Sequence, residues 1–215
     1  MTYNGGRTHP EMNGRKLVVA QSWARLFPDA QPIPNMIDIF DEDFMPHQED
    51  GPINIFYGYA SEHPSRWRRK GSTQVIPILN RVQQEYEGKV KIHIIRERPY
   101  KDVLEVKKKC HIVIGDCVTG GYHLTELEGA SVGAVTFCFI DNTTLRAMQT
   151  FSKADGHPFI KTHVTQLYVN LKRYIENQET REQIQKKART WMEQYWNPKD
   201  MVQHYIKKYE EVLHK

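Results

Sequence analysis

Residues 115–133, GDCVTGGYHLTELEGASVG, lie between two apolar segments with β-strand character, HIVIG and AVTFCFI. A buried strand that ends in a glycine pair and continues into a short helix is a common anion site of open α/β sheets. The reason is that backbone N–H groups at the helix start point toward the turn, and the helix dipole favours negative charge there. We expect this helix to begin near Leu124 and to face the Gly120–Gly121 turn. The stretch therefore predicts a phosphate site.

The same helix carries two glutamates with different orientations. Glu128 lies four residues beyond Leu124 and shares its face of the helix. At that place a carboxylate can accept hydrogen bonds from two sugar hydroxyls. Glu126 is rotated by about 200° from Glu128 and cannot share this task.

Strand candidates recur along the chain and alternate with segments that can form helices. They are rich in β-branched and aromatic residues, and they occupy residues 16–20, 53–59, 90–95, 111–115, 134–140 and 159–163. Alternation of this kind predicts a parallel sheet with helices on both faces, and near-continuous apolar runs indicate strands buried on both sides. The expected fold class is α/β, a Rossmann-like parallel sheet with additional helices at its C-terminal end.

Helix boundaries follow from proline and capping residues. Pro77 has no N–H to donate, so the helix after residues 53–59 is expected to begin just before it, near Thr73. Residues 99–109 predict a further helix that ends in Lys107, Lys108 and Lys109, which we interpret as a solvated helix end rather than a binding patch.

Three more helices are expected after residue 164. Thr180 and Gln183 form a plausible capping box for the second of them. Asn197 and Pro198 are a typical cap and first-turn pair for the third. The third helix carries an aromatic-rich stripe that exceeds what a small sheet needs, which favours association with a neighbouring domain or subunit.

The chain divides into two parts. Residues 1–51 contain a proline-rich passage, FPDAQPIPNMID, with prolines at positions 28, 32 and 34, and predict an extended connector rather than a domain. We expect residues 1–15 to be loose and residues 16–51 to pack on another part of the molecule. Residues 52–215 form the expected nucleotide-binding domain.

Composition narrows the class of protein. The chain has 215 residues with a formal charge of +4, which suits a globular protein with its own core. Its three cysteines show no close pairing and predict buried free thiols, since a zinc site built from Cys110, His111, Cys117 and His123 matches no common ligand spacing. With no signal segment and no apolar run of about 20 residues, we expect a cytoplasmic protein without a membrane span.

Four loops at the carboxyl ends of the predicted strands are expected to meet at one edge of the sheet, where such folds bind ligands. They span residues 60–71, 96–100, 116–123 and 141–144. The first contains Ser65, Arg69 and Lys70, and the third contains the glycine pair. Together they offer a hydroxyl, two cations and several backbone donors to one diphosphate.

Three motifs resemble the C-terminal half of GT-B glycosyltransferases of the group 1 family: PNMID at 34–38, PS followed five residues later by KG at 64–71, and GGYHLTELEGASVGA at 120–134. The resemblance runs from about residue 31 to residue 213. In that family the PNxxD piece marks the crossing between two Rossmann-like domains. The resemblance implies a nucleotide-activated sugar as donor substrate, with no metal and no tightly bound cofactor.

The resemblance also assigns roles by position. Lys70 is expected to hold the diphosphate, and Glu128 the nucleotide ribose. Backbone contacts to the diphosphate are expected from Gly121, Tyr122 and His123, and a lining of the base pocket from Arg98 and Tyr100. The best candidates for catalysis are Lys70 and His123.

Two departures from the family pattern stand out. The retaining branch has a second glutamate eight residues before the ribose glutamate, where this chain has Gly120. An N-terminal domain, which normally supplies the acceptor site, is represented only by residues 16–38. We therefore expect the acceptor site to come from a second polypeptide, a second copy of this chain, or a large bound substrate.

Three hypotheses stay open on this evidence. The first is a glycosyltransferase, or its donor-binding part, acting on an acceptor hydroxyl, and the second is a non-catalytic nucleotide-binding or partner-binding module. The third is a compact glycosyltransferase acting on modified DNA, supported by Arg66, Trp67, Arg68, Arg69 and Lys70. The Asp41-Glu42-Asp43 triplet resembles a metal-binding motif of another glycosyltransferase fold, but we interpret it as a solvated helix start or turn. Asp116 can either contact a ligand or cap the Gly120 turn.

Overall fold

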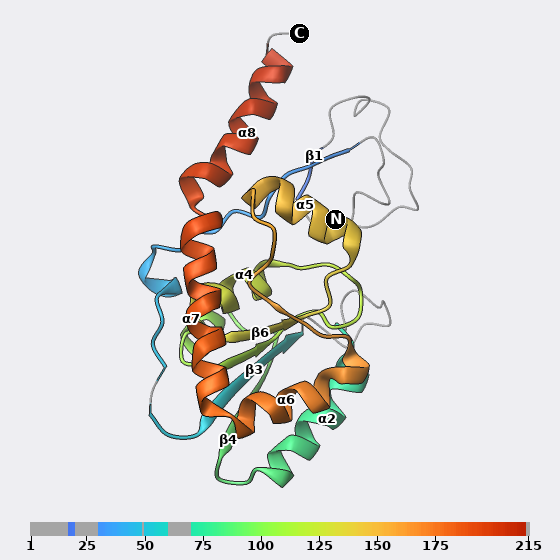
Figure 1. Ribbon diagram of the computed structural model, residues 1–215, viewed down its shortest axis with the longest axis vertical. Helices are drawn as coiled ribbons and strands as arrows, with labels where there is room; N and C mark the ends of the chain where they lie inside the picture. The colour runs from blue at the N-terminus through green and yellow to red at the C-terminus, as the bar shows by residue number, and fades with distance from the viewer. Residues whose placement is uncertain (1–16, 20–29, 49, 60–69, 214–215) are drawn as a thin grey trace.

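The computed structural model describes residues 17–19, 30–48, 50–59 and 70–213. At its centre is a parallel sheet of five strands in the order β4-β3-β5-β6-β7 (Figure 1). The strands are β3 (Ile53–Tyr59), β4 (Val90–Arg96), β5 (Ile112–Ile114), β6 (Val135–Cys138) and β7 (Ile160–Lys161). In the register, Ile55 pairs with Ile92 on one side and with Ile112 on the other. The predicted α/β class and the parallel sheet are confirmed.

Helices cover both faces of this sheet. On one face lie α2 (Ser72–Glu85) and α6 (Leu167–Glu176), which run next to each other in Figure 1. Their apolar sides, including Leu79 and Leu171, pack on Ile55 and Phe137 in one buried cluster. On the other face lie α3 (Tyr100–Lys107) and α4 (Leu124–Ser131). Each fully buried Leu or Phe side chain contributes about 1.5–3 kcal/mol to folding.

A second cluster joins the C-terminal helices to the connector. It contains side chains of α4, α5 (Asn142–Ser152), α7 (Gln178–Tyr195) and the start of α8 (Pro198–Leu213), around the fully buried Trp196. The connector includes the short parallel pair β1 (Leu17–Val18) and β2 (Gln31–Pro32) and the 3-10 helix η3 (Glu42–Phe44). A second 3-10 helix, η4 (Val164–Gln166), lies directly before α6. Ile37 and Ile39 of the connector enter the cluster, and the Trp196 indole N–H donates to the Asn35 carbonyl at 3.1 Å.

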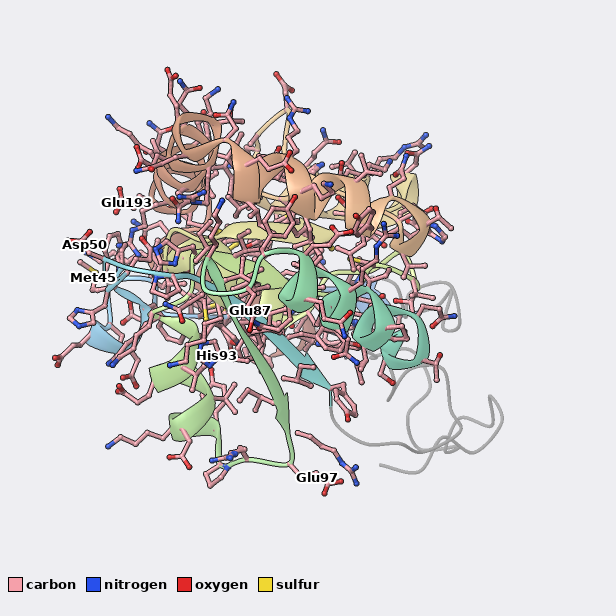
Figure 2. The ribbon with its side chains drawn as sticks, turned by 90° about the horizontal axis from the view of Figure 1, so that it is seen from below. Met45, Asp50, Glu87, His93, Glu97 and Glu193 are labelled. Carbon is pink, nitrogen blue, oxygen red and sulfur yellow. The ribbon has the colours of Figure 1, made fainter. Side chains whose placement is uncertain are left out.

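Arg189 of α7 ties three separate segments together. One nitrogen of its guanidinium donates to the carbonyls of Ile39 at 3.1 Å, Phe44 at 3.0 Å and Ser131 at 2.7 Å. The same side chain pairs with Glu193, which Figure 2 labels on the side of the molecule that also holds Met45. The connector, α4 and α7 are therefore fastened at one point.

Most helix boundaries agree with the sequence, with one clear correction. Helix α2 begins at Ser72 and contains Pro77, close to the expected start near Thr73. The cap of α8 is confirmed, since Asn197 Oδ1 accepts the Lys199 N–H at 2.9 Å. The capping box expected at Thr180 and Gln183 is wrong, because α7 begins at Gln178.

The true cap of α7 is Asn177, whose Oδ1 accepts the Thr180 N–H at 2.8 Å. In the connector, Asp41 caps η3 by accepting the Asp43 N–H at 2.9 Å, which confirms a turn at this acidic triplet. The three cysteines are buried free thiols, as expected. No helix in the described part of the chain is long and apolar enough to cross a membrane.

Candidate functional site

The site lies at the carboxyl edge of the sheet. Three of the four expected loops connect a strand to the next helix, but two are shorter than expected: residues 97–99 join β4 to α3, residues 115–123 join β5 to α4, and residues 139–141 join β6 to α5. Lys70 and Gly71 lead into α2. Figure 2 labels Glu97 just beyond the carboxyl end of β4, which marks this edge. Ser65 and Arg69, together with Arg66, Trp67 and Arg68, lie outside the described residues.

Lys70 is held against the start of α4. It has a left-handed backbone with φ +42°, followed by Gly71 with φ +71°, and the Tyr57 hydroxyl donates to its carbonyl at 3.1 Å. A side chain at Gly71 would lie 2.5 Å from Val118 Cγ2, so glycine is required there. The Lys70 ammonium donates to Thr125 Oγ1 at 3.1 Å. The structure thus brings together Lys70 and the first turn of α4, which are far apart in the sequence.

Asp116 organises the glycine turn, the name used here for residues 116–123. Its buried carboxylate accepts the N–H groups of Val118 and Thr119, each at 2.8 Å, and the Thr119 hydroxyl. His123 Nε2 lies 3.7 Å from Asp116 Oδ2. Burial alone would raise the pKa of Asp116, but the nearby His123 ring and the hydrogen bonds from Thr119 and Val118 outweigh it and lower the pKa to about 2. Of the two roles considered for Asp116, the structure shows the cap of the turn.

Glu126 fixes the other end of the turn. Its fully buried carboxylate accepts the Asp116 N–H with one oxygen and the His123 N–H, at 2.7 Å, with the other. A side chain at Gly115 would collide with Glu126, which explains the glycine at the end of β5. Two consequences follow: Glu126 faces away from Glu128 as expected, and the His123 N–H is already engaged within the turn.

Gly120 has a structural reason to lack a side chain. Its φ is +87°, and a Cβ at this position would lie 2.6 Å from Asp141 Oδ2. Asp141 is itself fixed as the cap of α5, because its Oδ1 accepts the Thr144 N–H at 2.9 Å and its N–H donates to the Gly120 carbonyl at 3.0 Å. At the position where the family resemblance leads us to look for a carboxylate, an added side chain would therefore be strained and would have to displace Asp141.

Tyr122 presents its backbone, and not its ring, to the turn. The ring is buried and meets Trp196 edge-on, with 6.0 Å between ring centroids, and Phe159 at 5.9 Å. The neighbouring Gly121 carbonyl accepts the Cys138 thiol at 3.5 Å. The aromatic residue thus anchors the glycine turn in the core, and the His123 side chain stays 24% exposed.

Glu128 has two partners that the sequence did not indicate. It forms an ion pair with Lys107, in which each side chain is only 2% exposed, and it accepts the Tyr100 hydroxyl at 2.7 Å. The Lys107 ammonium also lies 4.8 Å from the centre of the Phe56 ring. Burial lowers the pKa of Lys107, and the Glu128 carboxylate opposes that shift. Burial and the hydrogen bond to Glu128 raise the pKa of Tyr100, so its hydroxyl stays protonated and donates.

The interpretation of residues 107–109 as a solvated helix end is wrong for Lys107. Lys108 does behave in that way, since it pairs with the partly exposed Glu105 at 2.7 Å. Lys107, in contrast, points inward from the last turn of α3. The available signal was its spacing, because Lys107 follows the buried Leu104 by three residues and shares its helix face. Arg98 is exposed in the loop that precedes α3.

A hollow of about 420 Å³ lies elsewhere, beside the amino ends of β3 and β4, where His93 Nε2 hydrogen-bonds Asn54 Oδ1 at 2.8 Å (Figure 2). It is separate from the carboxyl-edge loops. Among the described residues, no group of three or more His, Cys, Asp or Glu side chains is placed to hold a metal ion. None of the residues that line this hollow belongs to the candidate site around Lys70, the glycine turn and Glu128.

No family model and no curated protein matches the sequence. Solved structures match its fold. Sucrose-phosphate synthase from Thermosynechococcus elongatus is 11% identical with a TM-score of 0.61, and the match covers 92% of this chain and 58% of that chain. Anabaena HepE in complex with UDP and glucose is 12% identical with a TM-score of 0.60, and the match covers 91% of this chain and 62% of that chain. The C-terminal domain of a glycosyl transferase group 1 family protein from Francisella tularensis matches over 75% of this chain and 98% of its own length, at 11% identity and TM-score 0.53.

At these low sequence identities, the matches show a shared fold and nothing more. The chain has the Rossmann-like fold of the C-terminal domain of GT-B glycosyltransferases, as the sequence motifs implied. It spans less than two thirds of the length of sucrose-phosphate synthase and of HepE, and almost the whole of the isolated C-terminal domain.

Proposed function

We propose that this chain binds a nucleoside diphosphate sugar and transfers its glycosyl group to an acceptor hydroxyl. One observation carries the proposal: the Lys70 ammonium contacts Thr125 in the first turn of α4, and Glu128 lies one turn further along the same helix. A diphosphate at the glycine turn and a ribose at Glu128 would follow the line of this helix. The fold supports the assignment, and HepE, which shares that fold, was solved with UDP and glucose.

The proposed chemistry rests on charge. As the acceptor oxygen bonds to the anomeric carbon, the bond from that carbon to the diphosphate breaks and the departing diphosphate gains negative charge, while the acceptor hydroxyl proton passes to the departing diphosphate or to water. In this proposal Lys70 and the amino end of α4 stabilise this charge, which is usually the largest single contribution to catalysis, and the contact between Lys70 and Thr125 supports that role. His123, oriented by Asp116, can donate a hydrogen bond to a phosphate oxygen with its side chain. Its N–H is held by Glu126, so we assign the remaining backbone contacts to Gly121 and Tyr122.

The binding step is tested with a panel of UDP, GDP, ADP and CDP and their sugar conjugates. A ligand present at about 100 times its Kd stabilises the folded state by about 2.7 kcal/mol, which raises Tm by roughly 5–10 °C for a chain of this size. Lys70→Met should abolish the rise. Lys89→Met, at an exposed lysine beside the amino end of β4, is the matched control and should leave it unchanged. Absence of a shift with every nucleotide would refute the proposal.

A second candidate, a nucleotide-binding module without catalysis, is favoured by the occupied space at Gly120. Asp141 Oδ2 lies 2.6 Å from the place of a Cβ at position 120, so a second carboxylate carried by that residue would have to displace it. Both candidates predict nucleotide binding, so the experiment that separates them is turnover. Slow hydrolysis of the bound nucleotide sugar by the wild-type chain, reduced in Lys70→Met, supports the enzyme, whereas binding without any release of sugar supports the module.

A further inference from the structure

Glu128 is closed to solvent although it is the carboxylate assigned to the ribose. Its side chain is 2% exposed, with Lys107 on Oε2 and the Tyr100 hydroxyl on Oε1 at 2.7 Å. An ionised carboxylate offers about four acceptor positions, so two are taken before any ligand arrives. A ribose can reach Glu128 only if one of these partners moves.

The two partners differ in how firmly they are held. Lys107 is buried at the end of α3 against the Phe56 ring, and an uncompensated buried charge is costly. Tyr100 is the first residue of α3, directly after Pro99, and it is 55% exposed. A rotation of its side chain is all that is needed to uncover Oε1, at the cost of one hydrogen bond. Of the two partners, Tyr100 is therefore the one that a ligand can displace.

We propose that Tyr100 is a displaceable cover on Glu128 and that Lys107 is the fixed residue that positions the carboxylate beneath it. This inference rests on the proposed function: hydroxyls of the ligand ribose take the place of the Tyr100 hydroxyl, while Lys107 keeps the carboxylate in place. A ligand without ribose hydroxyls leaves the cover closed. Tyr100 then acts as a selectivity residue, because only a ligand that restores the lost hydrogen bond to the buried charge can open it.

Binding measurements distinguish a cover from a merely structural contact. The probe is the nucleoside diphosphate of the panel with the largest Tm shift, titrated by calorimetry beside its 2′,3′-dideoxy form. Tyr100→Phe removes the competing hydroxyl and should tighten the ribonucleotide about 10-fold, because a hydrogen bond to a charged group no longer has to be broken. Binding of the dideoxy form should not change. If Tyr100→Phe leaves the ribonucleotide affinity unchanged or weakens it, the cover is refuted.

Tyr168→Phe is the matched control, since the Tyr168 hydroxyl also donates to a carboxylate, that of Glu85, but between α6 and α2. It should not alter either affinity. Lys107→Met should reduce the preference for the ribonucleotide over the dideoxy form to near unity, and Lys108→Met should not. An unchanged preference in Lys107→Met would overturn the positioning role, because a purely structural lysine would affect both ligands equally.

A measurement without nucleotide tests the cover alone. In a Lys107→Met, Glu128→Cys variant, the thiol at position 128 should react slowly with iodoacetamide, and adding Tyr100→Ala should accelerate the reaction at least 10-fold. Lys107→Met combined with Glu128→Gln, which carries neither charge, gives the baseline of the three buried native cysteines. Equal rates with and without Tyr100 would refute the cover whatever the nucleotides do. Faster alkylation without any nucleotide binding would instead refute the proposed function and leave the cover standing.

Discussion

Removing the Lys107 charge should destabilise the protein strongly. Lys107→Met keeps most of the buried hydrocarbon and deletes the ammonium, so Glu128 is left as an unpaired charge at a site where both side chains are 2% exposed. Breaking a buried pair in this way costs about 3–5 kcal/mol, a large part of the roughly 5–15 kcal/mol that keeps a domain folded. With a urea dependence near 3 kcal/mol per M, the unfolding midpoint should fall by about 1–2 M. The assay is urea denaturation followed by tryptophan fluorescence, to which the buried Trp196 contributes.

Two further variants make this prediction refutable. Lys107→Met combined with Glu128→Gln removes both charges and should recover at least half of the lost stability, because a neutral amide is far less costly to bury. Lys108→Met removes a lysine whose pair with Glu105 is a solvent-screened surface ion pair, which contributes little to stability. If Lys107→Met loses no more stability than Lys108→Met, the argument is wrong. If Lys107→Met does not fold, the double variant must fold for the argument to hold.

Three other predictions concern the glycine turn and its surroundings. Gly120→Ala, with φ +87° and a Cβ 2.6 Å from Asp141 Oδ2, should lower the unfolding free energy by about 1–3 kcal/mol, and a loss below about 0.5 kcal/mol in denaturation would contradict the close contact. Gly129→Ala places a Cβ 2.9 Å from Val113 Cβ and should push α4 from the sheet at a cost of about 1–3 kcal/mol, seen as a lower Tm. The fold lowers the pKa of Asp116 from 3.8 to about 2, so its carboxylate contributes about 2 kcal/mol to the free energy of unfolding above pH 4 and loses that contribution as the pH falls toward 2. The free energy of unfolding, measured as a function of pH, should show this loss in the wild type and not in Asp116→Asn.

The sequence was sufficient for features that depend on local patterns. The apolar run at residues 53–59 coincides with β3, and the helix expected near Leu124 begins at that residue. Both follow from short-range rules, because a strand buried on both faces needs continuous apolar residues and a helix after a glycine turn needs a cap. The three family motifs then sufficed to indicate the fold.

Features that depend on distant partners were missed. Lys107 stands in a run of three lysines at a helix end, which is typical of solvated positions, and only the fold brings Glu128 to it across 21 residues. Gly120 reads from the sequence as a missing carboxylate, whereas the structure shows that Asp141 occupies the space. In both cases the deciding contact joins segments whose relative position is set by the sheet order, which no local pattern encodes.

The Arg189 contacts have a consequence for the order of folding. They join α7 to carbonyls 150, 145 and 58 residues away in the sequence. Closing such long loops has a high entropic cost, so these hydrogen bonds become favourable only after the sheet and α4 have formed. We expect these bonds to form after the rate-limiting step. Weakening them with Arg189→Lys should then accelerate unfolding while the folding rate stays nearly constant. The connector would accordingly be among the first segments to exchange its amide hydrogens with solvent, ahead of the central sheet.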